Sequence, residues 1–421
     1  MISPARENWP TKRLRFLTRR GLSERQRRLL AQASQVTFLP MEAIGEQGEL
    51  DLSGVRELED VQTGYTQFFD GDVVVAKITP CFENGKGALV RGTLHGVGFG
   101  TTELHVLTPT HDLDGHFLYY VTASAPFRRL GEAGMTGAAG QKRVPWDFVR
   151  DYPTAVPPLS QQRAIADYLD RETARLDALV VAKERVLGLL AEKRRTLITR
   201  AITRGLNPST PLRGSVIPWL GKIPAHWGIE RSRWLFRERD ERSVAGEEEM
   251  LTVSHLTGVT PRSEKNVNMF EAETNEGYKI CFAGDLVINT LWAWMGAMGV
   301  ANVNGIVSPA YNVYQPGPRL EPTFIDALVR MPVFAQEVTR YSKGVWSSRL
   351  RLYPEGFFEV FLPVPPIEEQ RVIVAHIVKE TTKLDALRSA TERTILLLKE
   401  RRAALIAAAL TGQINVVEAN A

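Results

Sequence analysis

The chain has 421 residues, of which 44% are hydrophobic and 24% charged, and its formal net charge is +4 at pH 7. Such a length exceeds one ordinary domain, and the composition is typical of a soluble protein with several packed units. Neither Cys81 nor Cys281 has a Cys or His neighbour at metal-ligand spacing, and no segment approaches the roughly 20 apolar residues that cross a bilayer. We therefore expect a cytoplasmic protein without disulfides. The mild positive charge permits a nucleic-acid partner without indicating one.

Residues 1–156 are predicted to form a first domain of the α+β class. Strands are expected over 73–79 and 101–109, a hairpin turn at Asn84-Gly85, a helix over 117–130 and a glycine-rich loop over 134–145. The strand signals are β-branched runs and alternation, and the loop signal is its glycine content.

Residues 157–207 and 365–415 are two copies of one sequence. Aligned at an offset of 208 residues they need no gap, and roughly 23 of 51 positions are identical. Repeats of this size divide a chain into structural units. We expect two spacer helices here, separated by a second domain over 208–364 and followed by a short tail over 416–421.

Both copies carry residues at intervals of seven, a spacing typical of helices that pack along their length. The series are Leu169, Leu176, Lys183, Leu190 and Leu197, with Leu179 and Val186 interleaved, and Ile377, Leu384, Leu398 and Leu405, with Leu387 interleaved. About 45 helical residues make a rod of roughly 65 Å, which cannot bury an apolar stripe alone. The two copies are therefore predicted to pack on each other as an antiparallel coiled coil.

The second domain repeats the order of the first in faint outline. Residues 282–290 resemble 69–77, residues 308–316 resemble 101–109, the stretch 341–354 takes the place of 134–145, and Trp227, Arg231, Arg233, Trp234 and Leu235 echo Trp9, Arg13, Arg15, Phe16 and Leu17. The economical explanation is one α+β domain present twice. Two copies of one fold with different surface residues suggest two different ligands of the same class.

No pattern in the chain is typical of a catalytic or metal centre. The stretch 134–142 lacks the Gly-Lys-Ser/Thr ending of a phosphate-binding P-loop, and no long helix follows the glycines at 96–100 as a dinucleotide fingerprint requires. His105, His111 and His116 are spaced too irregularly for a metal motif. This pattern favours a recognition module that binds no cofactor of its own.

Polar and basic residues gather on the predicted loops of both domains. DNA phosphates bind Lys and Arg, while base edges bind Arg, Gln, Asn and Ser. The candidate DNA-binding residues are Lys77, Asn84, Lys86, Gln141, Lys142 and Arg143 in the first domain and Asn289, Lys343, Ser347, Ser348, Arg349 and Arg351 in the second. Trp292 and Trp294 have the character to stack on a base, but we expect them in the core.

Three stretches of the chain are distinctive: VPPLSQQRAIADYLDRETARLDAL from Val156, VPPIEEQRVIVAHIVKETTKLDAL from Val364 and GQKRVPWDFVRDYP from Gly140. With these stretches the chain resembles the specificity subunits of type I restriction–modification systems. The resemblance implies that each domain is a target-recognition domain reading half of a split sequence in double-stranded DNA. It also implies that the helices fix the gap between half-sites and dock two methyltransferase subunits. The stretch 341–354 departs from the GQKRVP form.

Catalysis would then belong to the partner subunits, which would bind S-adenosylmethionine and, where restriction/translocase subunits join, ATP and Mg. The candidates for holding the partners are Arg163, Glu172 and Asp177 with their counterparts Arg371, Glu380 and Asp385. One alternative is a coiled-coil scaffold that binds proteins and never DNA. Another is an enzyme fused to its own recognition domains, which the missing catalytic motifs disfavour.

Overall fold

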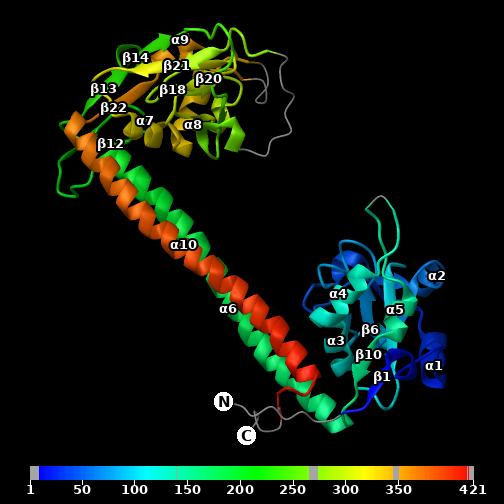
Figure 1. The fold of residues 1–421 in the computed structure, drawn as a ribbon. Helices are drawn as coiled ribbons and strands as arrows, with labels where there is room; N and C mark the ends of the chain where they lie inside the picture. The colour runs from blue at the N-terminus through cyan, green and yellow to red at the C-terminus, as the bar shows by residue number, and fades with distance from the viewer. Residues whose placement is uncertain (1–8, 139, 265–273, 345–349, 415, 417–421) are drawn as a thin grey trace. The chain divides into compact units, whose positions relative to one another are not determined.

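The computed structural model describes residues 9–138, 140–264, 274–344, 350–414 and 416. It divides into two compact units, Met1–Glu184 with Glu392–Ala421 and Arg185–Thr391. The division falls inside two long helices, α6 (Leu159–Arg204) and α10 (Ile367–Leu410). Each unit therefore holds one α+β domain, the first part of one long helix and the last part of the other (Figure 1). No helix among the described residues is long and apolar enough to cross a membrane.

The first unit is built on a four-stranded antiparallel sheet in the order β2-β9-β6-β7. Its elements are β1 (Thr11–Arg13), η1 (Leu14–Phe16), β2 (Thr18–Arg19), α1 (Glu24–Gln32), β3 (Gln35–Leu39), η2 (Met41–Ala43), β4 (Val55–Glu57), α2 (Leu58–Val61), β5 (Thr66–Phe69), β6 (Val73–Ala76), β7 (Gly87–Leu89), η3 (Leu94–Gly96), β8 (Val97–Gly100), β9 (Leu104–Pro109), α3 (Gly115–Ala123), α4 (Ala125–Ala133), α5 (Trp146–Asp151) and β10 (Pro153–Ala155). A second sheet has the order β4-β3-β8-β5, and β1 pairs with β10.

The second unit has a sheet of the same topology, β14-β21-β18-β19. Its elements are β11 (Leu212–Gly214), β12 (Lys222–Pro224), β13 (Gly228–Arg231), η4 (Ser232–Trp234), β14 (Phe236–Arg239), β15 (Leu251–Ser254), β16 (Gly258–Pro261), η5 (Arg262–Glu264), β17 (Lys279–Cys281), β18 (Leu286–Asn289), η6 (Ala293–Met295), β19 (Met298–Val300), β20 (Gly305–Val307), β21 (Tyr311–Pro316), α7 (Pro322–Val329), α8 (Pro332–Arg340), α9 (Pro354–Glu359) and β22 (Phe361–Val364). The pairing of β13 with β22 matches that of β1 with β10. The prediction of one α+β fold present twice is confirmed.

Two details of the first domain differ from the sequence-based expectation. The helix expected over 117–130 is two helices, because Ser124 leaves the helical conformation and its hydroxyl caps α4, with Pro126 in the first turn. The strands β6 and β7 do pair, as a hairpin requires, but a loop over 77–86 joins them. Gly85, at φ 88°, lies inside this loop and does not form a two-residue turn.

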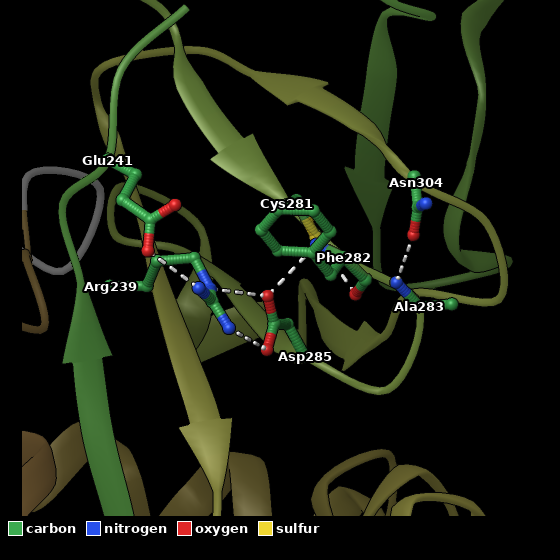
Figure 2. Close-up of polar contacts among 7 residues, drawn as sticks. All are labelled: Arg239, Glu241, Cys281, Phe282, Ala283, Asp285 and Asn304. Carbon is green, nitrogen blue, oxygen red and sulfur yellow. Dashed lines mark hydrogen bonds and ion pairs between the residues drawn. The ribbon is translucent and has the colours of Figure 1, made fainter.

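A buried carboxylate closes the turn before one inner strand of each main sheet, β6 in the first unit and β18 in the second. Asp72 accepts a hydrogen bond from the Phe69 amide at 2.8 Å, and Asp285 accepts one from the Phe282 amide at 2.9 Å. In the second unit Arg239 also binds Asp285, with Nε 2.8 Å from Oδ2, as Figure 2 shows. Burial raises the pKa of Asp72. The shared turn explains why both copies have Gly-Asp before a β-branched run.

Each long helix is fixed to its domain by a buried glutamine in its first turn. The Gln162 amide nitrogen donates to the carbonyls of Asp112 and Pro157 at 3.0 and 2.8 Å, and its oxygen accepts from the Asp114 amide at 2.8 Å. Gln370 repeats the three bonds with Arg319, Pro365 and Glu321 at 2.8, 2.8 and 2.9 Å. Both glutamines are fully buried.

The long helices pack antiparallel, as predicted, but the row of residues that accompanies those at intervals of seven is a different one. In the first unit Asp177 of α6 binds Arg402 of α10, and in the second Arg194 of α6 binds Asp385 of α10. The residues at intervals of seven are buried or half-buried. The interleaved residues Leu179, Val186 and Leu387 are instead 44%, 39% and 55% exposed. The second row of the contact lies four residues after the first and includes Thr173, Leu187, Ala201, Thr381, Ile395 and Ala409.

Candidate nucleic-acid interface

Equivalent backbone hairpins project from the two domains. In the first, Thr136 and Arg143 exchange backbone hydrogen bonds of 3.0 and 2.8 Å. In the second, Lys343 and Arg351 exchange two bonds of 2.9 Å. The bonded pairs enclose sequence segments of similar length, 137–142 and 344–350, of which 139 and 345–349 lie outside the described residues, and Figure 1 shows the first hairpin standing clear of its domain. These are the loops that the sequence nominated in both domains.

The hairpins are joined to the ends of the central strands. The Val144 amide donates to the Lys77 carbonyl at 2.8 Å, directly after β6, and the Leu352 amide donates to the Thr290 carbonyl at 3.0 Å, directly after β18. The loop 77–86 and its counterpart 290–297 begin at these points. Each domain thus places two loops together at one end of its main sheet.

An ion pair supports the base of the first hairpin. Arg143 binds Glu103 in a two-pronged arrangement, with Nε 2.9 Å from Oε2 and Nη2 2.8 Å from Oε1. The hydrogen bond from Arg143, together with its charge, lowers the pKa of Glu103, and the same bond together with the charge of Glu103 raises the pKa of Arg143. The guanidinium is therefore occupied within the protein and shapes the loop, while Gln141 and Lys142, which directly precede Arg143, are exposed.

The remaining candidate DNA-binding residues of the first domain differ in exposure and in whether their side chains are already bound within the protein. Asn84 is exposed on the loop 77–86, and Lys77 is half-buried where that loop begins. Lys86 donates from Nζ to the Met41 carbonyl at 2.9 Å, so it holds the loop to the domain. The side chains available at this end of the first sheet are accordingly Asn84, Gln141 and Lys142.

In the second domain the candidate DNA-binding residues have different surroundings. Asn289 is 5% exposed, and its Oδ1 accepts from the Leu291 amide at 3.2 Å, so it shapes the loop from inside. Lys343 and Arg351 are both exposed at the base of the hairpin. Ser347, Ser348 and Arg349 lie outside the described residues.

The expectation that both tryptophans of this loop lie in the core is wrong for Trp292, which is 52% exposed. Trp294 is half-buried, and its indole nitrogen donates to the Leu291 carbonyl at 3.0 Å. That bond holds the loop in place while Trp292 and Met295 face outward, the latter 42% exposed. An exposed aromatic beside the hairpin is suited to contact with a base or sugar face.

Sequence reasoning overlooked Thr290, which stands where the first domain has Lys77. Its hydroxyl donates to the Ala310 carbonyl at 2.8 Å, so the position is uncharged and internally bonded in the second domain. The sequence already contains this difference, because aligning 282–290 with 69–77 places Thr290 opposite Lys77. The divergence of the two interfaces therefore begins at the first residue after the central strand.

The six residues proposed to hold partners fall into three pairs. Arg163 and Arg371 reach Asp114 and Glu321 at 3.5 Å, each joining a long helix to the first turn of a domain helix. Asp177 and Asp385 lie in the contact between the long helices, where they bind the arginines described above, and not on an outer face. Glu172 and Glu380 are half-buried, and Glu380 binds Lys383 at 2.6 Å.

Among the described residues, no group of three or more His, Cys, Asp and Glu side chains is arranged to hold a metal ion. His105 is buried, and its Nε2 lies 2.8 Å from the Val144 carbonyl at the hairpin base. Burial lowers the pKa of this imidazole. Its position indicates a structural contact beneath the loop.

Two curated proteins, both specificity subunits of type I restriction enzymes, match parts of the chain. A stretch of 172 residues is 38% identical to the EcoAI type I restriction enzyme specificity subunit of Escherichia coli, covering 38% of this chain and 29% of that protein. A stretch of 134 residues is 42% identical to the EcoEI specificity subunit of the same organism, covering 31% and 22%. The matched stretches thus span less than a third of either relative. No protein-family model matches the chain.

Solved structures share the fold over nearly the full length. A chain from a study of complex assembly and conformational transition in the type I R-M system superposes with a TM-score of 0.73 at 19% identity, covering 96% of this chain and 98% of that one. The HsdS subunit of Thermoanaerobacter tengcongensis superposes with a TM-score of 0.61 at 17% identity, covering 98% of each. Two α+β domains with two long helices are therefore common to all three chains.

Proposed function

We propose that this chain, which belongs by sequence and fold with the specificity subunits of type I restriction enzymes, is the DNA-recognition subunit of such a complex. Each domain reads one half of a bipartite double-stranded DNA target. The observation that carries the proposal is the repeated pair of loops at the same end of equivalent sheets, with different side chains on each. One domain fold that carries different loop side chains in its two copies suits a target with two different halves.

The exposed groups match what DNA offers. Gln141, Lys142 and Asn84 supply an amide, a cation and a second amide to the first half-site. Trp292, Lys343 and Arg351 supply an aromatic face and two cations to the second. Amides and cations bind base edges and phosphates, and an aromatic ring packs on a base or sugar. The two half-sites therefore differ in sequence in this proposal.

The partners are proposed to carry the chemistry. Two methyltransferase subunits bind S-adenosylmethionine, and restriction/translocase subunits, where present, use ATP and Mg. This chain supplies recognition and binds no cofactor, and its DNA target places it in the cytoplasm. The long helices, continuous from one unit to the other, set the gap between the half-sites.

A salt-dependent binding assay tests the proposal against the scaffold alternative. The purified chain, with its methyltransferase subunit, is titrated with duplex DNA at 50 to 200 mM salt. Phosphate contacts make the affinity fall steeply, by a factor of roughly ten for a few contacts and more for many. A complex that binds no duplex at the lowest salt, yet still assembles with its partner, would establish the scaffold instead.

The base-contact residues are tested by methylome sequencing. Lys142→Ala together with Gln141→Ala is expected to relax the first half-site only, because both lie on the first hairpin. Trp292→Ala is expected to affect only the second. His111→Ala changes a 91% exposed residue of the first domain, just beyond the end of β9 that is remote from these loops, and serves as the control. Relaxation of the wrong half-site by either variant would refute the assignment.

A further inference from the structure

Phe16 and Trp234 are the two most exposed aromatic residues of the described chain. Phe16 is 69% exposed and Trp234 is 73% exposed. Each is the last residue of a short 3-10 helix, η1 or η4, that follows the strand pairing at the domain edge. Two units with little sequence in common thus expose a large ring at the same position, and such rings in the open are typical of interaction sites.

The surroundings of the two rings are also repeated. Arg13 and Arg15 both contact the carboxylate of Asp151 at the end of α5. In the second unit, by the same arrangement, Arg231 and Arg233 both contact Glu359 at the end of α9. A carboxylate that bridges two arginines fixes the backbone from which the ring projects.

The residues after the rings anchor this edge in the core. Leu17 is 1% exposed and Leu235 is 3% exposed. An outward ring between bonded arginines and a buried leucine is a rigid feature that cannot turn inward without disturbing the core. We call the two sites the edge anchors, Phe16 with Arg13 and Arg15, and Trp234 with Arg231 and Arg233.

The edge anchors lie at the end of the main sheet remote from the recognition loops. In the first unit Thr18, two residues after Phe16, pairs with Pro109, whereas Leu104 at the other end of β9 pairs with Ala76 beside the loop 77–86. Six residues of strand separate these ends by about 17 Å. The second unit repeats this, with Phe236 pairing Pro316 and Asn289 pairing Tyr311.

The chemistry of the edge anchors favours a protein over DNA. One carboxylate already pairs with the two arginines of each anchor and repels phosphate, and a 73% exposed indole gains most from an apolar pocket. The recognition loops differ between the units, as two half-sites require. The edge anchors are alike in both units, as two copies of one ligand require.

We propose that the edge anchors dock two copies of the same protein, one on each unit. Each copy offers an apolar pocket for the ring, with acceptor groups at its rim for the arginines. This rests on the proposed function, in which the two copies are methyltransferase subunits. Docking at the sheet end away from the recognition loops leaves those loops free for DNA.

Counting the bound subunits tests the proposal. The full chain and its methyltransferase subunit are co-purified, and the stoichiometry is measured by native mass spectrometry, with affinity from titration. Phe16→Ser and Trp234→Ser should each weaken one of the two sites about tenfold or more, as loss of an aromatic anchor does. At limiting concentration each single variant binds one copy, and the double variant binds none.

Controls separate this proposal from others. Leu130→Ser and Val244→Ser change residues that are 56% and 91% exposed elsewhere on the two units and should leave two copies bound. A double anchor variant that still binds two copies with unchanged affinity overturns the edge anchors but not the proposed function. A wild-type chain that binds no methyltransferase subunit overturns both. Weaker DNA binding with unchanged stoichiometry assigns the anchors to DNA and also refutes the proposal.

Discussion

At the residue scale, single buried side chains hold the interface and the helices in place. Gln162 and Gln370 each bond three backbone groups around the start of a long helix. The carbonyls of Pro157 and Pro365, just before the helices, accept from these glutamine amides, so each glutamine joins the start of its helix to the segment before it. The conserved spacing between the prolines and the glutamine in both copies thus has a direct structural cause.

Replacing Gln162 with leucine should destabilise the first unit selectively. Three backbone groups lose their partners, and each costs about 1–3 kcal/mol when left buried. Partial relaxation reduces the sum, so we expect the free energy of unfolding to fall by roughly 2–4 kcal/mol. Hydrogen exchange read separately for the two units measures it. Ser160→Ala, at an exposed position of the same turn, is the control, and an effect as small as that of the control would disprove the role.

The stability of the first unit should depend on pH through His105. Burial chiefly, with the charge of Lys77 adding to it, lowers its pKa, and the bond to the Val144 carbonyl offsets part of this. The unfolded chain therefore binds the proton at about pH 6.5, where the folded chain does not. Stability is complete above that value and is lost as the pH falls below it.

Thermal unfolding at pH 7.5 and pH 5.5 checks this dependence. The wild type should unfold at a lower temperature at pH 5.5, and His105→Gln should show a smaller difference between the two values. His255→Gln removes an exposed imidazole in the second unit and should keep the wild-type difference. An unchanged pH dependence in His105→Gln would show that other groups carry it.

At the element scale, the helix pair combines an apolar stripe with two crossed ion pairs. Arg402 lies four residues after Leu398, and Arg194 four after Leu190, so both arginines occupy the second row of the stripe. Their partners are the aspartates of the repeated Leu-Asp-Ala-Leu sequence. The ion pairs fix the register of the antiparallel packing in each unit.

The two ion pairs should contribute unequally. The side chains of Asp177 and Arg402 are 25% and 21% exposed, whereas those of Asp385 and Arg194 are 57% and 42% exposed. Exposed pairs couple by about 0.2–1 kcal/mol, and less exposed pairs couple more. Double-mutant cycles to alanine should therefore give the larger coupling energy for Asp177 with Arg402. Equal coupling in the two cycles would contradict the burial argument.

The helix pair also allows a test of the proposed gap. A turn added near Thr199 would displace Ala201 and Ile202, which are buried in the second unit's core. Seven residues inserted after Gly188 and seven after Thr391, which the Asp385–Arg194 pair places opposite each other, preserve the stripe. We expect the gap to lengthen by about 10 Å, roughly three base pairs, with both half-sites unchanged.

Methylome sequencing reads the outcome of the insertion. The matched control inserts seven residues in α6 alone, which breaks the pairing with α10 and should abolish specific methylation. Altered half-site bases with an unchanged gap in the double insertion would refute the role of the helices in setting the gap.

At the scale of the whole molecule, the chain consists of one fold used twice. The sheets β2-β9-β6-β7 and β14-β21-β18-β19 match strand for strand, and each domain begins and ends on an equivalent strand pair. Recognition loops vary on this frame without changing it. In the proposed function, two half-sites can then evolve separately, because the loops of one domain lie outside the core of the other.

Exchange of the second domain should therefore change one half of the target. Replacing 208–364 with the corresponding domain of another specificity subunit keeps both long helices and the whole first domain. We expect methylome sequencing to find the first half-site and the gap unaltered and the second half-site replaced. Changes in both halves would show that the domains do not read DNA independently.

The sequence by itself determined the duplication, the antiparallel helix pair and the order of elements. These follow from local patterns: a repeat without gaps, residues at intervals of seven, and β-branched runs after Gly-Asp turns. It also indicated which loops to examine, since residues 134–145 and 341–354 hold the same place in the two domains.

Only the tertiary structure decided which side chains of those regions are free. A step of three or four residues along a helix reaches opposite sides of the same stripe, so the sequence did not distinguish Leu179 from Val180 as the contact residue. Lys86 is bound by the Met41 carbonyl, 45 residues earlier, and Arg143 by Glu103, 40 residues earlier. Exposure and bonding depend on neighbours that are remote in the chain, and folding alone brings them together.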